Sequence, residues 1–273
     1  MRHFLESGKR ICILKRPTSR IDRIRDIADR ISFYEIPTGS MVPLLIEAQA
    51  HTVIHCATDY GRRDVPVTEI IEANLLLPLR LLEASSSTAL RTFVNTDTLL
   101  DKRINHYSLS KRHFREWLEN FSTPPVRCNI ALEHFFGPGD DRTKFVTKTI
   151  TELLDNQELI DLTPGEQRRD FIFISDVVEA FKCIIDFADH AQEGYYSYEV
   201  GGGQTTEIRE FVSLVKKLVG NKLTKLNFGA LPYRNNEIME SRVDLSALRD
   251  LGWWPKVSLV EGLRQTIEGE RNL

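Results

Sequence analysis

Several features that mark other classes of protein are missing from this chain of 273 residues. No apolar run approaches the ~20 residues that a membrane-spanning helix needs. Residues 1–8 alternate charged and apolar side chains, which is unlike a signal peptide. The net charge is only -3, so the chain lacks the basic surface typical of proteins that bind nucleic acid. We therefore expect a cytoplasmic protein that binds neither membranes nor nucleic acid.

Patterns typical of metal sites are absent as well. The chain contains no Cys-x-x-Cys and no His-Glu-x-x-His, and its histidines are scattered. Each cysteine falls within a predicted strand or helix; the four are Cys12, Cys56, Cys128 and Cys183. We expect buried, reduced thiols and no metal.

A tyrosine and a lysine four residues apart, Tyr107 and Lys111, are the most informative feature that is present. Residues i and i+4 share one face of a helix, so the ammonium would lie beside the phenol and lower its pKa from about 10. Such a phenol can exchange a proton with a sugar or alcohol oxygen near neutral pH. Thr96, at the end of a predicted strand, would hold that oxygen. Taken alone the spacing is weak, because an ordinary solvated helix face also produces it.

Strand and helix patterns alternate along the first half of the chain, which indicates a parallel sheet. Strands are expected at residues 10–14, 31–36, 52–57, 90–95 and 126–132, and helices near 20–30, 41–48, 68–84 and 107–120. Later helices are expected at 144–155, 177–188 and 207–219. The predicted fold is α/β, a doubly wound parallel sheet of the Rossmann type with a smaller C-terminal substrate lobe.

Several segments occur together in the order typical of one family. They are residues 55–61, 93–98, 107–111, 136–139, 168–176 and 244–253, with Asn74. On these the chain resembles the extended short-chain dehydrogenase/reductase family, the NAD(P)-dependent epimerases, dehydratases and reductases of nucleotide sugars. Within the family, residues 95–98 and 107–111 are similar to those of CDP-abequose and CDP-paratose synthases, which are 4-ketoreductases.

This resemblance implies an enzyme with a cleft between two lobes. Residues 1–135 would bind NAD(P), and residues 136–273 would mainly bind the nucleotide sugar, with some segments returning to the first part. The catalytic residues would be Thr96, Tyr107 and Lys111. Ala57 and Asn74 would contact the cofactor together with Tyr107 and Lys111. A homodimer formed through a four-helix contact is common in the family and is left open here.

The substrate side of the cleft would carry its own set of residues. By family position, Arg169 and Arg234 would contact the nucleotide diphosphate, whose two charges need cationic partners. The alternative for each is a surface arginine. His134 stands close to the position where many relatives carry Asn, so its contact with the sugar is an open expectation.

Basic residues follow the second predicted strand, where an NAD-specific fold usually places an acid. Arg16 and Arg20, with the hydroxyl of Ser19, could bind a 2′-phosphate. NADP(H) is therefore the preferred cofactor, and NAD(H) is left open. The alternative is a solvated basic loop.

The reaction is predicted from the end of the strand that precedes Tyr107. Dehydratases of the family carry Thr-Asp-Glu there, whereas this chain has Thr96-Asp97-Thr98. Without the glutamate, elimination of water lacks a proton-handling group, so reduction of a 4-keto-6-deoxy nucleotide sugar is favoured. An epimerase with the same triad is one alternative, and a non-catalytic binding protein is another.

One expected element is missing from the printed sequence. A dinucleotide fold opens with a strand and a Gly-rich turn that binds the pyrophosphate, but residues 1–8 look like the second half of the following helix. A start upstream of residue 1 is favoured over a truncated product. Residues 201–203, although all glycine, lie too far downstream to replace the turn and predict a strand-to-helix connection.

Overall fold

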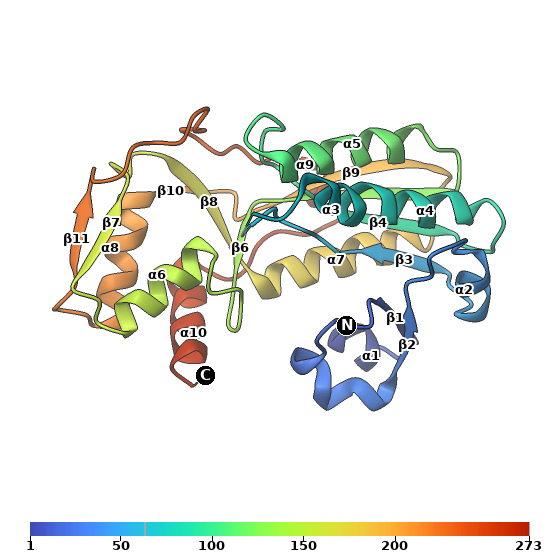
Figure 1. Cartoon of the computed structure of the whole chain (residues 1–273), viewed down its shortest axis with the longest axis horizontal. Coiled ribbons are helices and arrows are strands. Elements are labelled where there is room, and N and C mark those ends of the chain that lie inside the picture. The colour runs from blue at the N-terminus through green and yellow to red at the C-terminus, as the bar shows by residue number, and fades with distance from the viewer. Residues whose placement is uncertain (63, 273) are drawn as a thin grey trace.

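The computed structural model describes residues 1–62 and 64–272. Its central element is a parallel sheet with the strand order β3-β4-β5-β9 (Figure 1). The four strands are β3 (Thr52–His55), β4 (Thr92–Thr98), β5 (Val126–Leu132) and β9 (Gly194–Val200). Thr96, which was expected just after its strand, therefore lies within β4.

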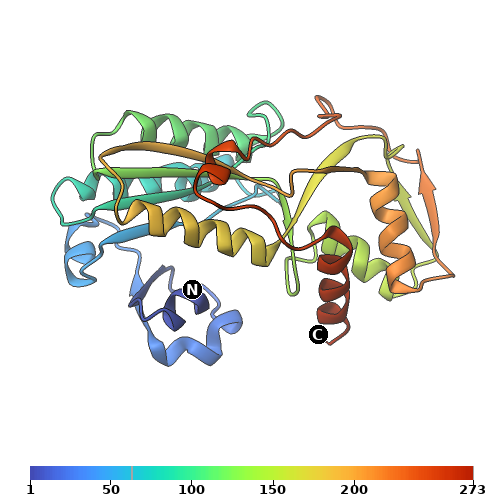
Figure 2. The same cartoon turned by 180° about the vertical axis from the view of Figure 1, so that it is seen from behind.

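Helices cover both faces of this sheet (Figures 1 and 2). One face carries α3 (Val67–Ile71), η2 (Glu72–Leu76), α4 (Leu77–Ser85) and α5 (His106–Asn120), and the other carries α7 (Ile174–Ala188). Successive residues of β4 point to opposite faces. Phe93 accordingly packs in one core with Phe114 of α5, while Val94 packs in another with Ile184 of α7. The predicted doubly wound α/β fold is confirmed.

The two N-terminal strands form a second sheet, which is separate from the four-stranded one. It consists of β1 (Ile11–Lys15) and β2 (Ile31–Glu35), which pair in parallel. Around it lie α1 (Arg2–Glu6), the 3-10 helix η1 (Asp22–Arg30) and α2 (Val42–Glu47). Among the described residues, β1 and β3 each have a single strand partner, so the parallel sheet expected from the alternation is divided in two (Figure 1).

The helix expected at residues 68–84 contains a turn of π-helix, η2. Pro78, two residues after its end, has no N–H to donate to the carbonyl of Asn74 four residues earlier, which disfavours regular α-helix at this point. The turn places the Asn74 side chain in the interior, where it is fully buried.

The remaining elements build a second lobe with its own core. They are β6 (His134–Phe136), α6 (Phe145–Leu154), β7 (Leu159–Leu162), β8 (Arg168–Phe173), β10 (Thr205–Glu207), α8 (Ile208–Val219), β11 (Lys225–Phe228) and α10 (Leu259–Arg271). The short helix α9 (Ser246–Asp250) packs instead on the four-stranded sheet, as α7 and β9 do. The exact boundary at residue 135 stays a prediction.

No helix among residues 1–62 and 64–272 has both the length and the apolar character required to cross a membrane. The cytoplasmic location and the homodimer stay predictions.

Candidate active site

A large cleft of ≈ 2450 Å³ separates the sheets and the second lobe. It is lined from three directions: by β1 and the loop that follows it, by the ends of β3 and β4, and by β6, α6 and residues 231–242. Carboxyl ends of parallel strands meet at one edge of a sheet, which explains why the polar residues that follow β3 and β4 share this cleft. Thr96 and Tyr107 both line it.

The first turn of α5 positions Tyr107. Asn105 caps the helix, since its side chain accepts a hydrogen bond from the backbone N–H of Ser108 at 2.8 Å. In return, the Ser108 hydroxyl accepts a hydrogen bond from the backbone N–H of Asn105. One turn later Lys111 is almost fully buried, with 1% of its surface exposed. Its ammonium donates to the carbonyl of Thr96 at 2.8 Å and so ties α5 to β4.

Burial dominates the titration of this pair. It lowers the pKa of Lys111 to about 8, although the nearby charge of Asp97 acts in the opposite direction. The pKa of Tyr107 is raised, first by burial and then by Tyr60, while a hydrogen bond with Thr98 acts to lower it. The lowering of the phenol pKa by Lys111 that the helix spacing predicts is therefore absent, because the phenol is desolvated and the ammonium is directed at a backbone carbonyl.

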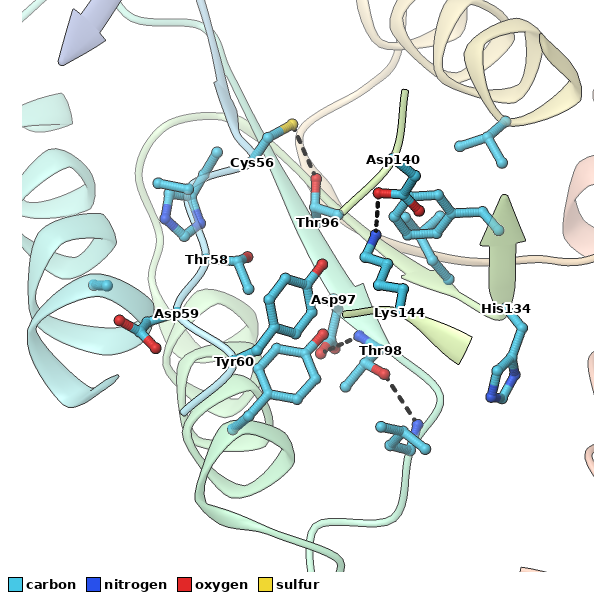
Figure 3. A pocket seen from close by; sticks show the side chains of 18 of the residues that line it. Cys56, Thr58, Asp59, Tyr60, Thr96, Asp97, Thr98, His134, Asp140 and Lys144 are labelled. Atoms are coloured by element: carbon cyan, nitrogen blue, oxygen red, sulfur yellow. Dashed lines mark hydrogen bonds and ion pairs between the residues drawn. The ribbon is translucent and has the colours of Figure 1, made fainter. Parts of the chain in front are cut away.

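The hydroxyl of Thr96 is held by an unexpected neighbour. It lies 3.2 Å from the thiol of Cys56, which follows β3 directly (Figure 3). Cys56 is exposed to the cleft, so the expectation that it would be buried within a strand is wrong: β3 ends one residue earlier. Cys128 is buried, and Cys12 and Cys183 are half-buried.

Asp97 and Thr98 complete the end of β4. Asp97 is 2% exposed and forms an ion pair with Arg115. Its carboxylate also accepts hydrogen bonds from the Asn129 amide at 3.1 Å and the Thr98 backbone N–H at 2.7 Å. The carboxylate is therefore held by structural partners, and the next position carries an uncharged hydroxyl.

The residues predicted to bind a 2′-phosphate are only partly brought together. Arg16 and Ser19 line the cleft in one turn, where the Arg16 N–H donates to the Ser19 hydroxyl at 3.1 Å. Arg20 is instead 88% exposed and pairs with Asp22 at 2.6 Å. The structure thus places two of the three at the cleft.

The two other predicted cofactor residues differ in position. Ala57 lines the cleft directly after Cys56. Asn74 does not line the cleft, because it is buried in the wall behind it and its side-chain amide forms three hydrogen bonds there. It accepts from the Asp59 N–H at 2.8 Å, and it donates to the Asp59 carbonyl at 2.8 Å and to the Ser110 hydroxyl at 3.0 Å. Asn74 anchors the loop after β3.

The predicted substrate residues meet on the wall formed by the second lobe. Arg169 is 9% exposed and pairs with Glu237, while Arg234 lines the cleft from the loop that also carries Glu237. The ring of His134 lies 2.8 Å from the carboxylate of Glu133. Three segments far apart in sequence thus bring two guanidinium groups and an imidazole to one wall.

Some cleft residues were not predicted from the sequence. Tyr60 lies on the ring of Tyr107, and Lys144 pairs with Asp140 at 3.0 Å in the same region (Figure 3). Tyr60 belongs to the family segment 55–61, which was the available signal; Lys144 lies just beyond the segment 136–139. No group of His, Cys, Asp or Glu suited to a metal occurs among residues 1–62 and 64–272.

Comparison with curated proteins finds similar sequences that span most of this chain. A CDP-abequose synthase of Salmonella muenchen is 34% identical over 272 residues, which cover 96% of this chain and 90% of the relative. A CDP-abequose synthase of Salmonella typhimurium is 32% identical over 235 residues, or 82% of this chain and 78% of the relative.

Solved structures agree on the fold. The UDP-glucose 4-epimerase of Thermotoga maritima, solved with UDP-glucose, has a TM-score of 0.84 at 21% identity and covers 99% of this chain and 94% of its own. The UDP-glucose 4-epimerase of Thermus thermophilus, solved with NAD, has a TM-score of 0.80 at 20% identity with the same coverage. The model of the NAD dependent epimerase/dehydratase family matches residues 1–201. The chain belongs to this enzyme family.

Proposed function

We propose that the protein is an NADP(H)-dependent reductase of a 4-keto-6-deoxy nucleotide sugar. The observation that carries the proposal is the end of β4 beside Tyr107. There Thr96 faces the cleft, the carboxylate of Asp97 is held by Arg115, and Thr98 stands where a dehydratase would carry a glutamate. The similarity to CDP-abequose synthases supports the same assignment.

Each residue of the triad has a distinct task in this proposal. The bound nicotinamide supplies the hydride. The Tyr107 hydroxyl donates the proton to the 4-oxygen, and the raised pKa of this phenol keeps the proton in place until the oxygen develops negative charge. Thr96 holds the oxygen by a hydrogen bond. Lys111, bonded to the Thr96 carbonyl, fixes β4 against α5 and places a positive charge behind the site.

The two ends of the cleft suit the two ligands. At one end, Arg16 and Ser19 supply a guanidinium and a hydroxyl for a 2′-phosphate. At the other end, Arg169 and Arg234 supply two guanidinium groups for the nucleotide diphosphate, and His134 lies beside them to contact the sugar. The similarity to CDP-abequose synthases supports a pyrimidine nucleoside diphosphate as the nucleotide part of the substrate.

The test is an assay with NADPH and a panel of CDP-, dTDP-, UDP- and GDP-linked 4-keto-6-deoxyhexoses. Oxidation of one NADPH for each sugar reduced supports the proposal. Interconversion of sugar epimers without consumption of NADPH indicates an epimerase. Tight binding of the nucleotide sugars without either reaction indicates a binding protein.

A further inference from the structure

Two aromatic rings from different elements lie against each other in the cleft. Tyr60, from the loop after β3, and Tyr107, from the first turn of α5, have ring centroids 4.9 Å apart with a tilt of 44° between their planes. This separation is within the range in which aromatic rings attract each other. Tyr60 is half-buried and lines the cleft, whereas Tyr107 is 9% exposed.

Two cations also lie near the Tyr60 ring. The guanidinium of Arg62 lies 5.1 Å from the centroid of the Tyr60 ring, and the ammonium of Lys144 lies 5.6 Å from it, both within cation–π range. Lys144 is itself fixed by Asp140 (Figure 3). Arg62 donates to the hydroxyl of Thr143. Contacts with residues 140–144 therefore restrain the Tyr60 ring within the cleft.

The backbone that carries Tyr60 is fixed to the backbone that carries Tyr107. The buried amide of Asn74 binds both the N–H and the carbonyl of Asp59, and it donates to the Ser110 hydroxyl. That hydroxyl in turn donates to the carbonyl of Tyr107 at 2.8 Å. Gly61, which follows Tyr60, has φ +64, a conformation that suits glycine. Its N–H donates to the Asp59 carboxylate at 2.8 Å.

We propose that Tyr60 is a positioning residue of the reaction: its ring holds the ring of Tyr107, and so the proton-donating hydroxyl, in one orientation toward the cleft. The inference rests on the proposed function, in which Tyr107 donates the proton. The ring of Tyr60 carries this role, and its hydroxyl is not required. A phenylalanine should therefore replace Tyr60, whereas an aliphatic residue should not.

The test combines NMR of protein labelled with ¹³C-tyrosine and steady-state kinetics. The variants are Tyr60→Phe and Tyr60→Leu, and Tyr34→Leu serves as a control because Tyr34 lines the same cleft. The Tyr107 signal is assigned by its loss in Tyr107→Phe. We expect Tyr60→Leu to shift and broaden this signal and to lower kcat roughly tenfold with little change in KM. Tyr60→Phe should restore both the signal and kcat.

An unchanged Tyr107 signal or an unchanged kcat in Tyr60→Leu would overturn the inference. An equal loss in Tyr34→Leu would do the same, because the effect would then be general to the cleft. Tyr60→Gln provides the same comparison if Tyr60→Leu does not fold. The NMR result does not depend on turnover, so a failure to reduce any keto sugar would reject the proposed function separately.

Discussion

At the scale of single residues, the spacing of Tyr107 and Lys111 places both side chains on one helix face without making the lysine a partner of the phenol. The ammonium donates to the Thr96 carbonyl, and burial determines the direction of both pKa shifts. Three predictions about single side chains follow from this arrangement and from the turn at Arg16.

Tyr107→Phe removes the hydroxyl but keeps the ring that lies on Tyr60. Loss of a proton donor should lower kcat by about 10²-fold or more, while the affinities for NADPH and the nucleotide sugar stay nearly unchanged. Steady-state kinetics and calorimetric titration of both ligands measure the two effects. A turnover near that of the wild type would remove Tyr107 from the role of proton donor.

The pKa of Lys111 predicts a dependence of activity on pH. Because burial lowers this pKa from 10.5 to about 8, Lys111 loses its charge in the folded protein as the pH rises through about 8. If the charge supports proton donation, kcat/KM should fall over that interval. Lys111→Arg stays charged at high pH and should shift the fall upward. The same fall in both proteins would assign it to another group.

Cofactor selectivity is tested by two neighbouring arginines. Arg16→Ala should weaken NADPH binding by roughly 1.5–3 kcal/mol, the scale of a hydrogen bond to a charged group, and should affect NADH much less. Arg20→Ala is the control, because Arg20 pairs with Asp22 and does not line the cleft. Equal losses for the two cofactors in Arg16→Ala would argue against a 2′-phosphate site there.

At the scale of elements, the glycines after β9 have a structural use. Asp170 of β8 accepts hydrogen bonds from the backbone N–H groups of Gly202 and Gly203, which join β9 to β10 and α8. These glycines therefore form a strand-to-strand turn that binds a buried carboxylate of the protein itself. The strand-to-helix connection predicted for residues 201–203 is therefore wrong in its second element, because the short strand β10 precedes α8.

Close packing at this turn predicts the effect of a single methyl group. A Cβ at Gly202 would lie 2.6 Å from the carbonyl oxygen of Phe171 and 3.0 Å from the Asp170 carboxylate. Gly202→Ala should therefore lower the free energy of unfolding by about 1–3 kcal/mol, as overpacking does. Gly39→Ala is the control, because its Cβ would meet nothing within 4 Å. Urea denaturation of both variants measures the difference.

At the scale of the whole molecule, the division of the sheet sets the distribution of stability. The four-stranded sheet is packed on both faces, whereas β1 and β2 are supported by a small core whose buried members are Leu5, Ile27 and Ile31. Few buried apolar contacts and an unpaired strand edge favour local opening. The two sheets should therefore open independently.

Hydrogen–deuterium exchange measured by mass spectrometry tests this expectation. Peptides from β1 and β2 should exchange faster than peptides from β4 and β5, whose strands have partners on both sides. Saturating NADPH should slow exchange in β1 more than in β5, because β1 lines the cleft and residues of the following turn are proposed to bind the cofactor. Equal exchange rates in the two sheets would show that they open as one unit.

The sequence by itself determined the features that depend on local pattern. Alternation of apolar strands and amphipathic helices is a property of neighbouring residues, so β5 matches its predicted range 126–132 and α5 begins one residue before its predicted start. The family segments likewise identified Thr96, Tyr107 and Lys111, which the structure brings to one region. Side-chain periodicity is enough for the first result, whereas the second rests on the resemblance to the family.

Only the tertiary structure decided which groups pair with which. Arg20 could be assigned to a phosphate from its position, but its partner is Asp22; Asn74 could be assigned to the cofactor, but its amide fixes the loop that carries Tyr60. Cys56 leaves the strand and meets the Thr96 hydroxyl. Such pairings depend on distances between segments remote in sequence and on burial, which raises the pKa of Tyr107 and lowers that of Lys111. Local spacing contains neither quantity.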